Sequence, residues 1–133
     1  MYVFLDIDGV LNTKADWKRS YTLNMRNVDD FCSWLKLQKA PTIVLISSWK
    51  RGFSPIRNNC STPLKNLLDY VDSKVSGVRY CITRDFRYRD EEVSNFLEHH
   101  SSDSYIVLDD DKSLYKKLPK NFRLINPNVG FRM

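Results

Sequence analysis

The chain has 133 residues, of which 42% are hydrophobic and 28% charged, with only four glycines, five prolines and three cysteines. This is the size and composition of one soluble globular domain over residues 1–133, and it argues against a linker-rich, disordered or disulfide-stapled protein. No apolar run approaches the roughly 18 residues that span a bilayer, so we expect a cytoplasmic location and no membrane partner, and the net charge of +5 favours anionic partners.

Short apolar runs alternate along the chain with segments of helical periodicity. Strands are predicted over residues 2–5, 42–46, 78–82, 105–108 and 122–125, and helices over residues 28–35, 63–71 and 91–100. Asn27 is expected to cap the first helix and Thr62 the second, with Pro63 in its first turn. Because strands that are almost wholly apolar are buried on both faces, the pattern predicts an α/β domain in three layers, with a doubly wound, Rossmann-like parallel sheet of five strands.

Polar residues directly follow three of these strands. Asp6 and Asp8 follow the first strand, Ser47 and Ser48 the second, and Asp109 to Asp111 the fourth. In a doubly wound sheet, ligands bind beyond the carboxyl ends of the strands, near the point where strand order reverses. We therefore expect these residues to share one cleft.

The segment Asp6-Ile7-Asp8-Gly9 places two carboxylates on alternate residues after a buried strand. Both can face the same cleft while Ile7 packs inward, and Gly9 lets the backbone turn and approach a ligand closely. One carboxylate can attack a phosphorus atom and form an aspartyl-phosphate. The other can protonate the leaving oxygen and later take a proton from water. The pattern therefore favours phosphate-ester hydrolysis.

Clustered carboxylates beside an anionic phosphoryl group require a cation. Oxygen ligands at this density suit Mg²⁺, and Asp109 and Asp110 are its natural further ligands. Ser47 can donate to a phosphate oxygen, and a lysine or arginine can neutralise the charge that develops in the transition state. Ser47 and Ser48 are also suited to capping the segment that follows them, which leaves a structural role open.

Four motifs, taken in order, resemble those of the haloacid dehalogenase (HAD) superfamily. They are DIDGVLN at residues 6–12, TIVLIS ending at Ser47, Arg89 ahead of Glu91-Glu92-Val93, and LDDD at residues 108–111. More narrowly, LISSWKR, RDEEVSNFL, YIVLDDD and the closing NPNVGF resemble the capless domain of multi-enzyme RNA-repair proteins and their stand-alone relatives. The resemblance covers essentially the whole chain and implies a capless, HAD-like phosphatase.

The resemblance also implies roles for individual residues. It implies Asp6 as the nucleophile and Asp8 as the general acid and base. It implies Mg²⁺ held by Asp6, the backbone carbonyl of Asp8 and an acid of LDDD. For that acid Asp110 aligns best, and Asp109 is the alternative.

Two of the implied positions have competitors in the sequence. Many members carry a further acid three or four residues beyond the metal-binding aspartate, where this chain has serine and leucine at 113–114, and Asp111 is the nearest substitute. Arg89 matches the basic residue of the third motif, but Arg84 and Arg87 lie close enough to compete for that role.

The stretch from Thr13 to Thr22 is too short for a cap domain and is rich in basic and aromatic residues, namely Lys14, Trp17, Lys18, Arg19 and Tyr21. Such a mixture suits a phosphate backbone and stacked bases. The residues predicted to bind substrate are Gly9, Lys14, Trp17, Ser48 and Lys50. The alternative for this stretch is a solvated loop in which Trp17 folds over the core.

The sequence therefore predicts a magnesium-dependent phosphomonoesterase for the terminal phosphate of a nucleotide or nucleic acid. One alternative is a phosphatase of small metabolites or of phosphoproteins. Another is a catalytically decayed module that binds nucleic acid or a partner on the same scaffold, although intact Asp6, Asp8 and Ser47 speak against decay.

Overall fold

A wholly parallel sheet of five strands forms the centre of the computed structural model, which describes residues 1–100 and 104–133. The strands are β1 (Tyr2–Leu5), β2 (Thr42–Leu45), β3 (Arg79–Ile82), β4 (Tyr105–Asp109) and β5 (Phe122–Leu124). Their order across the sheet is β3-β2-β1-β4-β5, and Tyr2 of β1 pairs with Thr42 of β2 on one side and with Tyr105 of β4 on the other. The predicted doubly wound α/β fold is confirmed.

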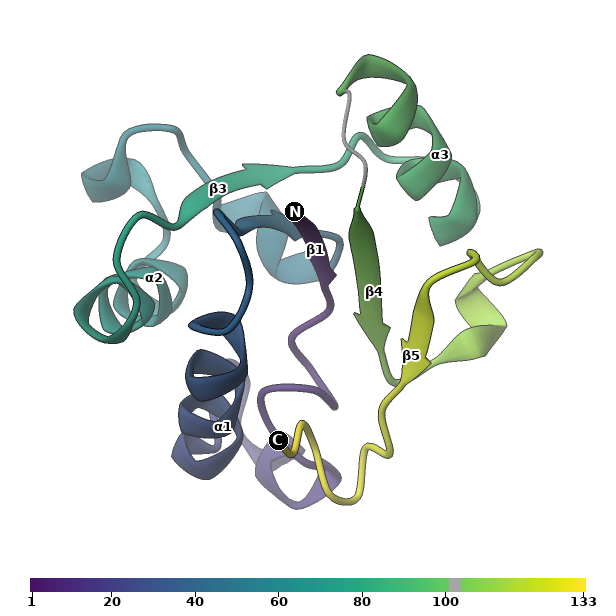
Figure 1. Cartoon of the computed structure of the whole chain (residues 1–133). Helices are drawn as coiled ribbons and strands as arrows, with labels where there is room; N and C mark the ends of the chain where they lie inside the picture. Colours follow the sequence, from purple (N-terminus) through teal and green to yellow (C-terminus); the bar gives the residue numbers. More distant parts are fainter. Residues whose placement is uncertain (101–103) are drawn as a thin grey trace.

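Within the described residues, three α-helices cover the sheet: α1 (Met25–Leu35), α2 (Thr62–Lys74) and α3 (Arg89–His99). Figure 1 shows α1 and α2 on one side of the sheet and α3 on the other. The side chains of β1 alternate between these two layers. Val3 and Leu5 belong to the core that α1 and α2 cover, whereas Phe4 packs with Phe96 of α3. A strand buried on both faces is apolar at every position, which is why β1 reads as an uninterrupted apolar run.

Helix α1 begins earlier than the sequence predicts. Asn24 caps it by accepting the backbone N–H groups of Arg26 and Asn27 at 3.1 and 3.3 Å. Asn27, the expected cap, is instead buried, and its side-chain amide donates to the backbone oxygens of Val129 and Phe131 at 3.0 and 2.9 Å. Asn27 therefore ties the closing NPNVGF segment to α1, and Figure 1 shows the C-terminus beside that helix.

The cap of α2 is Ser61, and Thr62, the expected cap, is the first helical residue. Pro63 lies in the first turn, as predicted. A capping side chain accepts the N–H of the second or third helical residue, and Pro63, in second place, has no N–H to donate. Ser61 accordingly makes no side-chain hydrogen bond to the helix.

Strand β1 stands where the order of the strands reverses. The chain runs outward from β1 to β2 and β3, and then crosses back through α3 to β4 and β5 on the other side. The carboxyl ends of β1 and β4 are neighbours, since the N–H of Asp6 donates to the oxygen of Leu108 at 3.0 Å. Asp6 and the aspartates that end β4 consequently meet at the crevice where such sheets bind ligands.

The two connections beside this crevice carry no inserted domain. Residues 6–24, between β1 and α1, hold a single 3₁₀ helix, η1 (Lys14–Lys18), and residues 83–88 join β3 directly to α3. The sheet end is therefore uncapped, as expected. In the part of the chain that the structure describes, no helix combines the length and the apolar composition needed to cross a membrane.

Candidate active site

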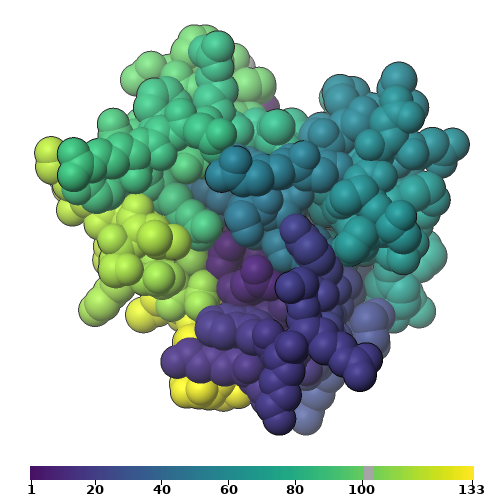
Figure 2. All heavy atoms as spheres, turned by 180° about the vertical axis from the view of Figure 1, so that it is seen from behind, coloured from purple at the N-terminus to yellow at the C-terminus, as the bar shows by residue number. Residues whose placement is uncertain are grey.

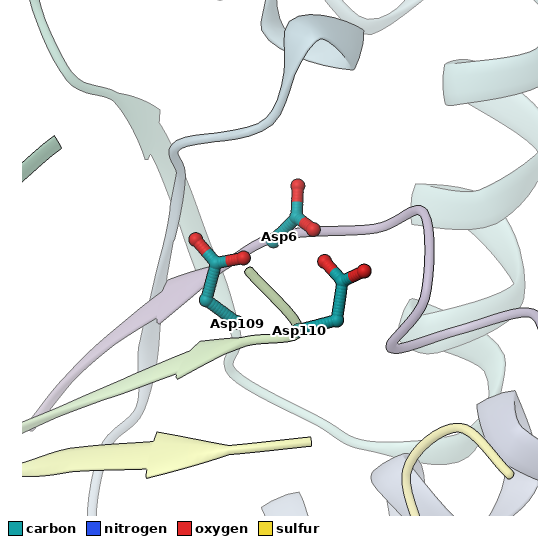
Figure 3. Close-up of side chains that lie close together, drawn as sticks. All are labelled: Asp6, Asp109 and Asp110. Carbon is teal, nitrogen blue, oxygen red and sulfur yellow. The ribbon is translucent and has the colours of Figure 1, made fainter. Parts of the chain in front are cut away.

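Three aspartates meet at the carboxyl ends of β1 and β4. Asp6, Asp109 and Asp110 each offer a carboxylate oxygen, and these atoms lie within 4.8 Å of one another. Figure 3 shows Asp109 and Asp110, from the end of β4, flanking Asp6, from the end of β1. Asp6 and Asp109 are buried and Asp110 is half-buried. Such a set of oxygens favours a bound proton or cation, because three carboxylates so close together, two of them buried, repel one another strongly.

The pKa values of the cluster reflect this crowding. Burial and the charge of Asp109 raise the pKa of Asp6 well above its ordinary value, against the opposing effect of Arg89. Burial also raises the pKa of Asp110. A raised pKa disfavours the ionised carboxylate, and a divalent cation among these oxygens would restore it.

Arg89, at the start of α3, is the basic residue beside the cluster. Its Nη1 lies 2.7 Å from Oδ2 of Asp109 and 3.3 Å from Oδ1 of Asp6. Burial by itself lowers the pKa of Arg89, but the charges of Asp6 and Asp109 raise it well above the ordinary value, so the guanidinium stays charged. Arg84 and Arg87, its competitors in the sequence, are exposed and make no ion pair with a described residue. The geometry thus favours Arg89 for the third motif.

Asp109 and Asp110 differ in their surroundings. Asp109 is fully buried and accepts hydrogen bonds from Arg89, from the hydroxyl of Tyr115 at 2.7 Å and from the backbone N–H of Asp111 at 3.1 Å. Its oxygens are therefore already engaged by the protein. Asp110 is less buried and accepts no hydrogen bond from Arg89 or Tyr115, so it is better placed to bind a cation.

Gly9 explains why the chain turns so tightly over Asp110. Its φ is +87°, a conformation that favours glycine, and a Cβ added there would lie 2.3 Å from Oδ2 of Asp110. The close approach that Gly9 makes is thus to the carboxylate of Asp110, while its N–H donates to Oδ1 of Asn12 at 2.7 Å. Its predicted approach to the substrate stays a prediction.

Asp8 lies outside the acidic cluster and faces a different environment. Its Oδ1 accepts hydrogen bonds from the side-chain amide of Asn12 at 3.0 Å and from Nε1 of Trp49 at 3.3 Å. Asp8 also lines a cavity of about 410 Å³, whose other lining residues are Asn12, Trp17, Arg19, Ser20, Tyr21, Ser48 and Trp49. Asp6 does not line this cavity, so the two carboxylates of the first motif have different surroundings.

Asn12 organises the loop that follows β1, a role that its residue type alone does not predict. It is buried, donates to Asp8 and to the oxygen of Thr22 at 2.8 Å, and accepts from Gly9 and from Nε1 of Trp17 at 2.9 Å. Only its place as the last residue of DIDGVLN signalled a role. Trp49, another partner of the acids, lies within the LISSWKR segment of the resemblance, whereas Tyr115 carried no such signal.

The serines lie at the end of β2, next to β1. Ser47 is buried, and its hydroxyl oxygen accepts the N–H of Trp49 at 3.2 Å, so it does cap the 3₁₀ helix η2 (Ser48–Gly52). That bond does not use the hydroxyl hydrogen of Ser47, which can be donated to a ligand. Ser48 is exposed and lines the cavity beside Asp8.

Of the basic residues predicted to bind substrate, Lys50 is engaged by the protein itself. Its buried ammonium lies 2.8 Å from both Glu92 and Asp85 and donates to Oγ1 of Thr83 at 3.1 Å. An ammonium has three donors, so these partners satisfy it. Lys14 is exposed at the start of η1. The substrate roles of Lys50 and Lys14 stay predictions.

A parallel, doubly wound sheet with DxDG after its first strand, a serine after the second, an arginine at a helix start and paired acids after the fourth defines a HAD-type domain. A family model described as the HAD domain in Swiss Army Knife RNA repair proteins matches residues 2–133. The chain belongs to this family, which confirms the resemblance drawn from its motifs, and membership implies a phosphatase-type function. No curated protein and no solved structure matches the chain.

The residues present fit the magnesium ion that such domains use. Three hard carboxylate oxygens within 4.8 Å of one another are suitable ligands, and burial together with the charge of Asp109 raises the pKa of Asp6, so a cation there would be stabilising. A single arginine, Arg89, faces this charge among the residues described. The donor set therefore suits a divalent cation.

Proposed function

We propose that this protein is a magnesium-dependent phosphomonoesterase that forms an aspartyl-phosphate on Asp6 and acts on the terminal phosphate of a nucleotide or nucleic acid. The observation that supports it is the division between the two carboxylates of the first motif. Asp6 lies in an acidic cluster beside Arg89, whereas Asp8 faces a separate cavity with its Oδ1 held by two N–H donors. The first environment suits a nucleophile beside a cation, and the second fixes the orientation of a carboxyl group that can exchange a proton with a ligand in the cavity.

In the first step an oxygen of Asp6 attacks phosphorus, and the bond between phosphorus and the leaving oxygen breaks. Asp8 gives its proton to that oxygen, so the alcohol leaves uncharged. In the second step ionised Asp8 takes a proton from water, whose oxygen attacks phosphorus. The bond from phosphorus to Asp6 then breaks, which releases inorganic phosphate and returns both aspartates to their starting forms.

The other residues act on charge and orientation. Arg89 and the hydroxyl of Ser47 bind the phosphoryl oxygens and stabilise the charge that develops on them. Magnesium, held by Asp6, Asp110 and the backbone carbonyl of Asp8, would neutralise negative charge on the cluster and the phosphoryl group. Asp109 positions Arg89 through the contact at 2.7 Å.

A nucleic-acid substrate is supported by three features. The family is described by its occurrence in RNA repair proteins, the chain carries a net charge of +5, and exposed aromatic and basic residues of 14–21 adjoin Asp8. An uncapped site also leaves room for the end of a polymer.

A phosphatase screen tests this proposal. The purified protein is assayed with Mg²⁺ and with a chelator on oligonucleotides phosphorylated at the 3′ or 5′ end, on mononucleotides and on phosphopeptides. We expect Mg²⁺-dependent release of phosphate from nucleotide ends, and none from the Asp6→Asn variant. Preference for phosphopeptides or sugar phosphates would overturn the substrate class. Binding of nucleic acid without any turnover would indicate a decayed module.

A further inference from the structure

The cavity beside Asp8 is walled by three aromatic residues, two of them exposed. Trp17 and Tyr21 expose 43% and 59% of their surfaces. Trp49 forms another part of the lining and is buried, and the ring of Tyr21 meets it edge-on with centroids 5.0 Å apart. Single exposed aromatic residues are common on surfaces, but three around one cavity next to a reactive carboxylate are a platform for a planar ligand.

Tyr21 holds its position in an unfavourable backbone conformation. Its φ is +59°, in the left-handed region that bulky residues avoid. Such conformations persist where the surrounding structure requires them, and they concentrate at ligand-binding sites. Here the turn at Tyr21 places its ring against Trp49, at the wall of the cavity.

The cavity lies on the side of the leaving group. In phosphoryl transfer the attacking and leaving oxygens are roughly in line on opposite sides of phosphorus, so the leaving group points away from Asp6. The acid that protonates the leaving oxygen must touch it. Oδ1 of Asp8 already accepts two N–H bonds, so Oδ2 is the oxygen left to contact the leaving group. Whatever is attached to the leaving oxygen therefore extends into the cavity that Asp8 lines.

We propose that this cavity binds the nucleoside that carries the scissile phosphate, with its base stacked on Trp17 and Tyr21. The proposal rests on the proposed phosphatase function and specifies its leaving group. A volume of about 410 Å³ lies near the lower end of the roughly 300–1,000 Å³ typical of ligand pockets, which suits one unpaired nucleoside and not a duplex end.

The polar lining matches a nucleoside better than another aromatic leaving group. Ser20, Ser48 and Asn12 offer hydrogen-bonding groups around the rings, as the edges of a base and a sugar require. Arg19 also lines the cavity and makes no ion pair with any described residue, so its charge is available to the next phosphate of a chain. A phosphotyrosine side chain would use the rings alone.

The test compares a nucleotide with the same sugar phosphate lacking the base, and adds polymer and peptide substrates. Release of phosphate is measured on a nucleoside 5′-monophosphate, on ribose 5-phosphate, on a 3′- and a 5′-phosphorylated oligonucleotide and on a tyrosine phosphopeptide. We expect kcat/KM to be at least about tenfold higher for the nucleotide than for ribose 5-phosphate, since stacking on aromatic side chains gives effects of about five- to hundredfold. The oligonucleotide arms show whether the nucleoside comes from a free nucleotide or a polymer end.

Three variants locate the effect. Tyr21→Ala should raise KM for the nucleotide about five- to hundredfold and affect ribose 5-phosphate far less, whereas Tyr21→Phe, which keeps the ring, should preserve the preference. Leu37→Ala is the control, because Leu37 is also an exposed apolar residue, at 71%, but lines neither this cavity nor the hollow beside Arg89. It should leave both values unchanged.

Two outcomes would overturn the proposal while leaving the phosphatase function intact: equal kcat/KM on nucleotide and ribose 5-phosphate, or a preference for the phosphopeptide that Tyr21→Ala abolishes. Absence of turnover on all substrates would instead contradict the proposed function. Calorimetry with the nucleotide and with ribose 5-phosphate then tests the nucleoside site independently of turnover. Equal affinities for the two ligands, or no loss of nucleotide affinity in Tyr21→Ala, would exclude that site.

Discussion

Asp6 and Asp8 are two residues apart in the sequence, yet the structure gives them opposite surroundings. Asp6 is buried among Asp109, Asp110 and Arg89, where its environment consists of charges. Asp8 faces a cavity, and its contacts are two neutral N–H donors. Strand β1 ends at Leu5 and Asp8 lies in the turn that follows, so the two side chains no longer share one face as alternate residues of a strand would. The comparison teaches that one short motif supplies two kinds of carboxylate, because different parts of the chain fold against each of them.

The largest effect expected concerns the charged side. Asp6→Asn should lower turnover by at least about a thousandfold, because an amide does not attack phosphorus. The fold should survive, since Arg89 keeps its contact of 2.7 Å with Asp109. Beryllium fluoride, which mimics an aspartyl-phosphate, should bind the unmodified protein with Mg²⁺ and fail to bind the variant.

Glu98→Gln is a suitable control for that measurement, because it makes the same change from carboxylate to amide on an exposed position of α3. It should retain full activity. Near-normal turnover by Asp6→Asn would contradict the assignment of the nucleophile, and with it the division of roles between the two aspartates.

On the cavity side, Asp8→Asn should act according to the leaving group. General acid catalysis contributes roughly a hundred- to ten-thousandfold, and only poor leaving groups require it. Loss of kcat should therefore be large on an alkyl phosphate or a nucleotide and clearly smaller on nitrophenyl phosphate. Equal losses on both substrates would exclude Asp8 as the acid, although not as the base of the second step.

The third prediction distinguishes Asp109, the last residue of β4, from Asp110, which follows it. Asp110→Ala should weaken Mg²⁺ binding by about a hundredfold or more, because it removes a direct ligand, and leave thermal stability nearly unchanged. Asp109→Ala should instead destabilise the fold, since Arg89 and the hydroxyl of Tyr115 would lose a fully buried partner. Calorimetry with Mg²⁺ and thermal unfolding measure the two effects, and the reverse pattern would make Asp109 the ligand.

The sequence predicted those parts of the site whose signal lies within a short stretch of neighbouring residues. Asp6, Asp8 and the acids after β4 were found because each follows an apolar run, and the ends of buried parallel strands share one edge of the sheet. The five strands and three helices were predicted from local patterns too, with errors of up to three residues at helix ends and at caps such as Asn27. Local periodicity carries this information.

The parts that were missed depend on contacts between distant segments. Lys50 sits in a basic run that suggests an exposed surface, but its partner Glu92 lies 42 residues further on. Trp49 reaches Asp8 across 41 residues. Asn27 resembles a cap in the sequence because nothing local shows its bonds to Val129 and Phe131. A single sequence gives no register for such pairs, so they appear only once the chain is folded.

The smallest effect expected tests whether the donors to Asp8 matter for catalysis or only for folding. Trp49→Phe keeps an aromatic ring in the buried position and removes the N–H that lies 3.3 Å from Oδ1 of Asp8. A hydrogen bond of this kind is worth about 1 kcal/mol, so kcat should fall by less than about tenfold. Because this N–H orients Asp8, the loss should follow the leaving group as in Asp8→Asn: measurable on an alkyl phosphate, and nearly absent on nitrophenyl phosphate. Trp34→Phe is the control, since Trp34 lies on α1 and packs against Phe31 and Phe131, not against Asp8. A uniform loss on both substrates, or an equal loss in Trp34→Phe, would mean that Trp49 supports the fold and not the proton transfer.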